Sequence, residues 1–189
     1  MRISRAVTAV GVSSLASVLL IISPTASDAS SGKAVRMFDD CEVSSFNAVV
    51  GPGTCVGDGE TTFSEFIAEV SRTKQAEQWR FSPEMLRVKS GRPVIVDNRG
   101  GETHTFTLVK MFGGGFIAPL NGLSGNTTLA PECAKEAADG SLVSAGPGEK
   151  SLFVSAGSKA AFKTAGLLPG TYQFQCCIHP WMRIILTVK

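Results

Sequence analysis

Residues 171–189 read T-Y-Q-F-Q-C-C-I-H-P-W-M-R-I-I-L-T-V-K and contain two strand-like segments around a short loop. Tyr172, Phe174 and Cys176 alternate with glutamines, so a strand here would place both rings and the first thiol on one face. A proline then reverses the chain, and residues 184–188 form a second strand-like run. The stretch therefore predicts two neighbouring strands joined by a loop.

The predicted loop brings together three groups that bind metals. Cys176, His179 and Met182 supply a thiol, an imidazole and a thioether. A thiolate and imidazoles form the plane of a blue-copper site, and a long thioether contact completes it. Such a site needs a second histidine, and the other of the two histidines in the chain is His104. We therefore expect one copper ion held by His104, Cys176, His179 and Met182.

These motifs resemble those of the cupredoxins, the type 1 copper proteins. The resemblance is carried by Y-x-F, by C-x2-H-P-x-M after it and by an upstream N-x5-H that ends at His104. The loop is most similar to that of amicyanin and pseudoazurin, and the resemblance covers roughly residues 79–189. It implies an all-β, Greek-key β-sandwich. It also implies Cys176 rather than Cys177 as the ligand. In the family pattern two residues separate the cysteine from the histidine, and only Cys176 has two residues between it and His179.

The resemblance further implies roles for individual residues. The two imidazoles and the Cys176 thiolate would form a trigonal plane, with Met182 as the axial contact. Thr105 occupies a position where the family often fastens the ligand loop. Trp181 is expected near the surface beside the metal, where it would shape a patch for a partner.

The implied function is that of a one-electron carrier that exchanges electrons with a redox partner protein, and not that of an enzyme. One alternative is a copper-binding or copper-tolerance protein without a dedicated electron-transfer partner. Another is a metal-free binding module of the same fold. Zinc could take the same ligands, and Cys176 and Cys177 could instead perform thiol chemistry. The net charge of +2 gives no electrostatic reason to expect nucleic acid as a partner.

The N-terminal residues are typical of an export signal. Arg2 and Arg5 precede a mostly apolar run over residues 6–22, and small residues follow it. We expect a signal peptide over residues 1–29, an extracytoplasmic location (periplasmic or secreted) and no membrane span after cleavage. An uncleaved membrane anchor is the alternative.

The five cysteines suggest disulfide bonds in an exported chain. If Cys176 binds the metal, four remain, and they allow three connectivities. We favour a bond between Cys41 and Cys55, which are close in sequence, and one between Cys133 and Cys177. A strand that continues through Cys177 would point that side chain away from the Cys176 face. The alternative is that one or more thiols stay free.

The remaining sequence divides into an N-terminal extension with one helix, residues 30–78, and the cupredoxin domain, residues 79–189. Residues 110–163 contain an insertion that carries Cys133. Such a long loop either covers part of the domain or has a function, and the alternative is a solvent-exposed decoration. A short helix is predicted near residues 131–138. Alternating apolar runs predict further strands at 86–88, 94–96, 104–109, 152–154 and 160–162.

The helix of the extension has a recognisable start. Thr62 and Glu65 have the spacing of a capping box, and apolar residues follow at helical intervals, to about Gln78. The same stretch is similar to the end of a calcium-binding loop. In that alternative, however, Thr54 and Val56 occupy positions where carboxylates are expected. Residues 30–35 are small and polar and predict a flexible leader.

Overall fold

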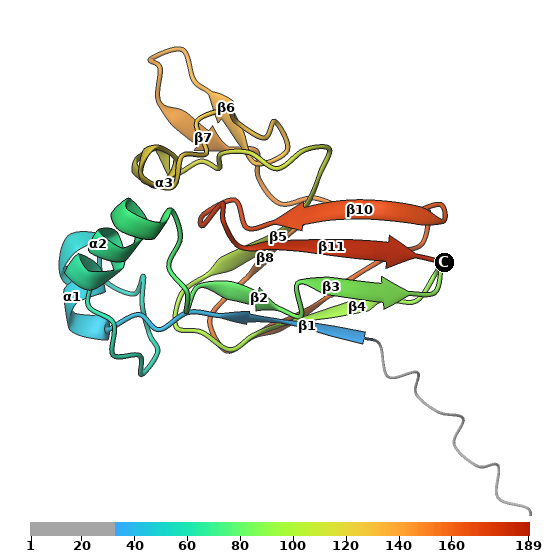
Figure 1. Cartoon of the computed structure of the whole chain (residues 1–189), viewed down its shortest axis with the longest axis horizontal. Coiled ribbons are helices and arrows are strands. Elements are labelled where there is room, and N and C mark those ends of the chain that lie inside the picture. The colour runs from blue at the N-terminus through green and yellow to red at the C-terminus, as the bar shows by residue number, and fades with distance from the viewer. Residues whose placement is uncertain (1–32) are drawn as a thin grey trace, which may run out of the picture. The chain divides into compact units, whose positions relative to one another are not determined.

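The computed structural model describes residues 33–189, which form two packed β-sheets and three short helices (Figure 1). One sheet has the strand order β2-β1-β4-β9, the second β3-β11-β10-β5-β8, and β6 and β7 form a separate pair. The strands are β1 Lys33–Phe38, β2 Arg80–Ser82, β3 Met85–Val88, β4 Val94–Asn98, β5 His104–Val109, β6 Ala134–Glu136, β7 Leu142–Ser144, β8 Ser151–Val154, β9 Lys159–Phe162, β10 Gly170–Gln175 and β11 Arg183–Val188.

The predicted all-β sandwich is confirmed, and so are the strands expected from alternating apolar residues. The chain crosses between the two large sheets after β2, β3, β4, β8 and β9. Strands β1 and β4 are parallel, as are β3 and β11, and the other pairs in the two large sheets are antiparallel. Strands β10 and β11 pair in register from Gly170↔Val188 to Gln175↔Arg183, which leaves a tight loop between them.

Four phenylalanines fill the space between the sheets. Phe81 and Phe162 come from one sheet, and Phe106 and Phe174 from the other. The rings of Phe106 and Phe174 are stacked with centroids 4.4 Å apart, and Phe162 lies edge-on to Phe174 at 4.8 Å. All four side chains are buried, so this cluster holds the faces of β5 and β10 against the opposite sheet.

The first described segment differs from the flexible leader expected through residue 35. Lys33–Phe38 is strand β1, which pairs with β4 on one side and β2 on the other. Val35 and Met37 point into the core, whereas their neighbours are exposed. This alternation spans too few residues to stand out in the sequence, and pairing with a distant strand decides it. The expected signal peptide lies outside the described residues.

The capping box predicted for the extension is confirmed in helix α2, Phe63–Thr73. The Thr62 hydroxyl accepts from the Glu65 backbone amide, and the Glu65 carboxylate accepts from the Thr62 amide at 2.9 Å. The expected end near Gln78 is wrong, because Lys74 adopts a left-handed conformation, φ 70°, and closes the helix on Val70. Glu65 therefore serves as a helix cap, and the sequence similarity to a calcium loop has no counterpart in its contacts.

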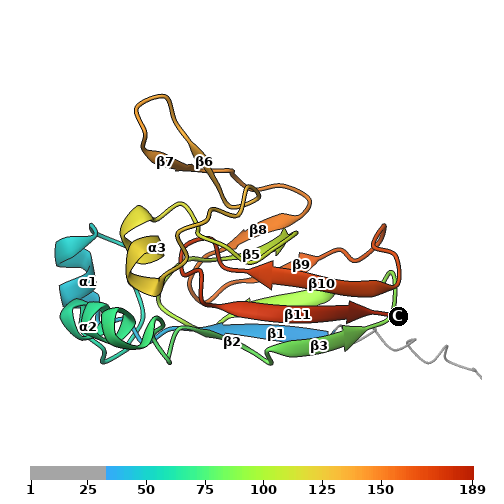
Figure 2. The same ribbon diagram turned by 45° about the horizontal axis from the view of Figure 1, so that its top comes forward.

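Two helices were not expected from the sequence. Helix α1, Val43–Val49, has seven residues and one buried side chain, Phe46, so its apolar spacing is too short to distinguish it from a loop. Helix α3, Ala118–Ser124, lies in the insertion, whereas the helix predicted near 131–138 is wrong, since those residues include β6. The three helices gather at the end of the sandwich where the β10–β11 loop lies (Figures 1 and 2).

Both favoured disulfides are present. Cys41 bonds to Cys55, and Cys133 bonds to Cys177, while Cys176 is the free cysteine among residues 33–189. In the same described part of the chain, no helix has the length and apolar character needed to cross a membrane.

Thiol titration should count this pattern directly. The denatured, metal-free protein, kept without reductant, should show one reactive thiol, and a Cys176→Ser variant should show none. Three or five reactive thiols would contradict the two disulfide bonds.

Candidate metal centre

Three of the four expected ligands come together at one end of the sandwich. His104, Cys176 and His179 each offer a ligand atom, and these atoms lie within 4.8 Å of one another. All three side chains are buried. His104 begins β5 on its inward face, and Cys176 and His179 lie in the loop between β10 and β11. The His104 Nδ1 atom is 3.9 Å from the Cys176 sulfur.

The loop itself is closed by backbone hydrogen bonds. The Cys176 amide donates to the Met182 carbonyl at 3.0 Å, and the Met182 amide donates to the His179 carbonyl at 2.9 Å. Met182, the fourth expected ligand, is buried and belongs to the same hydrophobic core cluster as Cys176. The loop is thereby fixed at both of its ends and in its middle.

Thr105 joins this loop to β5. Its hydroxyl accepts a hydrogen bond from the Cys177 amide at 2.7 Å, and its own amide points at the Cys176 sulfur at 3.4 Å. The fastening role expected for Thr105 is therefore confirmed. An amide directed at the sulfur stabilises the thiolate form.

The insertion covers the outer side of the loop. The Cys177 side chain points away from Cys176 and bonds to Cys133 in the insertion. The Gln175 side chain accepts from the Gly113 amide at 3.0 Å and donates to the Gly113 carbonyl at 2.9 Å. A Cβ on Gly115 would overlap the Cys177 carbonyl, so glycine is required for this close approach.

A carboxylate that the sequence did not indicate contacts His104. Asp39, just after β1, places Oδ2 2.8 Å from His104 Nε2, and both side chains are fully buried. Because Nε2 is engaged by a carboxylate, the Nδ1 atom is the one left for a metal. No local motif marked Asp39; its partner is 65 residues away.

His179 is held in a parallel way. Its Nε2 atom lies 3.5 Å from Glu102 Oε2, and the same oxygen accepts a hydrogen bond from the Trp79 indole at 2.6 Å. His179 Nδ1 is buried and has no hydrogen-bond partner among the described residues. A buried nitrogen normally has a hydrogen-bond partner, and a metal ion held together with the nearby thiol would give His179 Nδ1 one.

The charges of the cluster suit metal binding. Burial would raise the pKa of Cys176, but His104 and His179 outweigh it and hold that pKa well below its usual range. Burial would lower the pKa of His104, but hydrogen bonds to Asp39 and Cys176 raise it. Burial likewise would raise the pKa of Asp39, yet contacts with His104, Gly101 and Glu102 lower it to about 2. Cys176 is thus prepared as a thiolate, the form that binds metals.

Aromatic side chains cover the His179 side of the site. The His179 ring lies 5.6 Å from the Trp181 ring and 6.1 Å from the Phe66 ring of α2. Trp181, which was expected near the surface, is partly exposed, and its ring packs against Phe66 with centroids 5.9 Å apart. The helices of the extension therefore shield a histidine that the loop alone would leave open.

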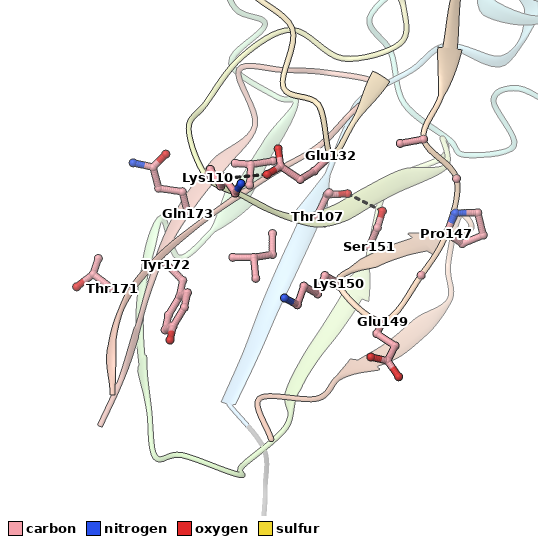
Figure 3. Close-up of a pocket in the computed structure, with 15 residues that line it drawn as sticks. Thr107, Lys110, Glu132, Pro147, Glu149, Lys150, Ser151, Thr171, Tyr172 and Gln173 are labelled. Atoms are coloured by element: carbon pink, nitrogen blue, oxygen red, sulfur yellow. Dashed lines mark hydrogen bonds between the residues drawn. The ribbon is translucent and has the colours of Figure 1, made fainter. Parts of the chain in front are cut away.

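Two surface cavities differ in their relation to the cluster. A cleft of about 540 Å³ opens among the three helices, and its lining includes Phe66, Glu102 and His179. A wider one of about 790 Å³ lies along β5 and β10, where Lys110, Lys150 and other polar residues line it (Figure 3). The cleft among the helices therefore reaches the cluster through His179. The cavity along β5 and β10 is lined by none of the three clustered residues.

Comparisons with known proteins give similar folds among solved structures. A reduced, Cu(I) form of an amicyanin variant is 19% identical over 61% of this chain and 77% of its own, with a TM-score of 0.35. A purple cupredoxin from Nitrosopumilus maritimus is 14% identical over 64% and 90%, with a TM-score of 0.36. Plastocyanin from Dryopteris crassirhizoma is 19% identical over 82% and 99%, with a TM-score of 0.38.

No protein-family model matches the sequence, and no curated protein matches it. The two sheets, with the Cys-His loop between the last two strands, have the arrangement that the sequence resemblance implied. The fold is a cupredoxin-like β-sandwich.

The Thr105 hydrogen bond can be tested by a change of nearly equal volume. Thr105→Val removes the hydroxyl and leaves the buried Cys177 amide without its acceptor, which should cost about 1–3 kcal/mol of unfolding free energy. Thr105→Ser keeps the hydroxyl and should lose less. Urea denaturation of the metal-free proteins measures both, and equal losses in the two variants would contradict the role of the hydroxyl.

Proposed function

We propose that this protein holds one type 1 copper ion and carries single electrons. His104, Cys176 and His179 would hold the ion, and the thioether of Met182 would be a weak fourth ligand. The observation that carries the proposal is the buried, unpartnered Nδ1 of His179 within the same cluster as the Cys176 sulfur and His104. The burial of Met182 in the same loop supports the fourth ligand.

The donor set fits copper better than zinc. Structural zinc sites use four strong nitrogen, sulfur or oxygen ligands, and catalytic zinc sites use three and a water. This cluster offers two imidazoles, one thiolate and a neighbouring thioether, which is the blue-copper combination. A thioether is a weak, soft ligand, and copper is the metal that makes use of it.

Bound copper would supply a one-electron couple, and the residues of the chain determine how easily it is used. His104 comes from a sheet strand, while the other ligands come from a hydrogen-bonded loop. Thr105 and the Cys133–Cys177 bond restrain that loop from the side opposite the cluster. Aromatic rings exclude water from His179. Ligands held in this way move little when an electron arrives or leaves.

The cellular setting is part of the proposal. Two disulfide bonds within residues 33–189 are typical of proteins in oxidising compartments and support an extracytoplasmic location, periplasmic or secreted. Removal of a signal peptide over residues 1–29 remains an inference from the sequence. The electron-transfer partner is a redox protein that reaches the helical end of the sandwich.

A copper-holding role without a dedicated partner is the second candidate. The observation that favours it is the cover over His179, which is 2% exposed beneath aromatic side chains. A covered ligand slows the release of a metal as well as the approach of a partner. The two functions therefore predict different redox kinetics at the same site.

The copper site has a direct spectroscopic test. The purified protein with one equivalent of Cu(II) should show an intense thiolate-to-copper absorption band and a type 1 EPR spectrum. Cys176→Ala should abolish the band, whereas Met182→Leu should keep it, since the axial contact is weak. A wild-type protein without the band would contradict the proposal.

Electrochemistry separates the two candidate functions. A carrier should give a reversible one-electron couple and fast self-exchange, because rigid buried ligands leave little to reorganise. Sluggish exchange together with very tight Cu(I) binding would overturn the carrier function and support copper holding.

A further inference from the structure

Both histidines of the cluster have a buried carboxylate on the ring edge away from the cysteine. Asp39 Oδ2 lies 2.8 Å from His104 Nε2, and Glu102 Oε2 lies 3.5 Å from His179 Nε2. Neither acid belongs to the ligand set, and the sequence motif contains neither. Because the two carboxylates occupy equivalent positions on the two imidazole rings, we expect both to act on the rings in the same way.

Asp39 is held firmly in place as an anion. Its carboxylate accepts hydrogen bonds from the Gly101 amide at 2.8 Å and from the Glu102 amide at 3.1 Å, besides the His104 contact. A Cβ on Gly100 would overlap this carboxylate, so the loop before β5 is shaped around it. The Cys41–Cys55 bond begins two residues later and fixes the backbone there.

Glu102 is fixed by an aromatic neighbour. Its Oε2 atom accepts the Trp79 indole proton at 2.6 Å, and Trp79 packs against Phe66 with ring centroids 4.5 Å apart. Glu102 is 6% exposed, so solvent screens its charge only slightly. The Glu102–His179 contact is longer than the Asp39–His104 contact. Glu102 should therefore affect the donor strength of its histidine less than Asp39 does.

We propose that Asp39 and Glu102 are positioning residues that lower the reduction potential of the bound copper. This rests on the proposed function of the cluster. Asp39 accepts the Nε2 proton of His104, and Glu102 places its charge 3.5 Å from His179 Nε2. Both contacts favour the tautomer that leaves Nδ1 free for the metal and make that nitrogen a stronger donor. Stronger donors and buried negative charge both favour Cu(II) over Cu(I), because Cu(II) carries the larger positive charge.

Neutral variants of nearly the same shape remove the charge. In Asp39→Asn the amide oxygen can still accept from His104 and Glu102, but the negative charge and the hydrogen bond from the Gly101 amide are lost. We expect the affinity for Cu(II), relative to Cu(I), to fall about tenfold, which corresponds to a potential about 59 mV higher for a one-electron couple. Glu102→Gln should shift the potential in the same direction by less. Asp139→Asn, at an exposed acid, should leave it unchanged.

The measurements are the potential of each copper-loaded protein and its affinities for Cu(I) and Cu(II) by competition. A merely structural role would weaken both affinities equally, so an unchanged ratio in Asp39→Asn would overturn the proposal. If Asp39→Asn fails to fold, the potential of copper-loaded Glu102→Gln is the test. An unchanged potential in that variant would overturn the proposal. Absence of the thiolate band in the wild-type protein would instead reject the copper site itself.

Discussion

The site depends on the alignment of the start of β5 with the end of β10. These strands pair antiparallel, and their pairing brings Thr105 beside Cys176 and Cys177. From there the inward face of β5 supplies His104, while Cys177, two residues past the end of β10, bonds to Cys133 of the insertion. A shift of one residue in this register would exchange the two faces and separate the thiol from the histidine.

The centre is enclosed from two directions by segments that a minimal sandwich does not need. The helices of the extension cover His179 with aromatic rings, and the insertion covers the outside of the ligand loop. Enclosure removes water from the ligands and strengthens the electrostatic effect of nearby charges. It also leaves the apolar cleft among the helices as an approach to His179.

The Cys-His loop could be predicted from the spacing of its residues, and most strands from alternating apolar residues. The two disulfides could be predicted because four cysteines, an even number, remain beside Cys176. The capping box of α2 could likewise be predicted from the spacing of its residues. Asp39 and Glu102 could not, because their importance arises from contacts across the fold, and isolated acids carry no pattern. Strand β1 and helix α1 were missed because each buries too few residues to establish a period.

The pairing of β1 with β4, and of Asp39 with His104, has a consequence for how the protein is made. Asp39, near the start of the described chain, contacts a cluster of which two members, Cys176 and His179, lie near its end. Such distant contacts form late in folding, because long loops must close before they are stabilised. A chain that is still being synthesised therefore lacks Cys176 and His179. The cluster of His104, Cys176 and His179 can assemble only after the last strand has joined the sheet.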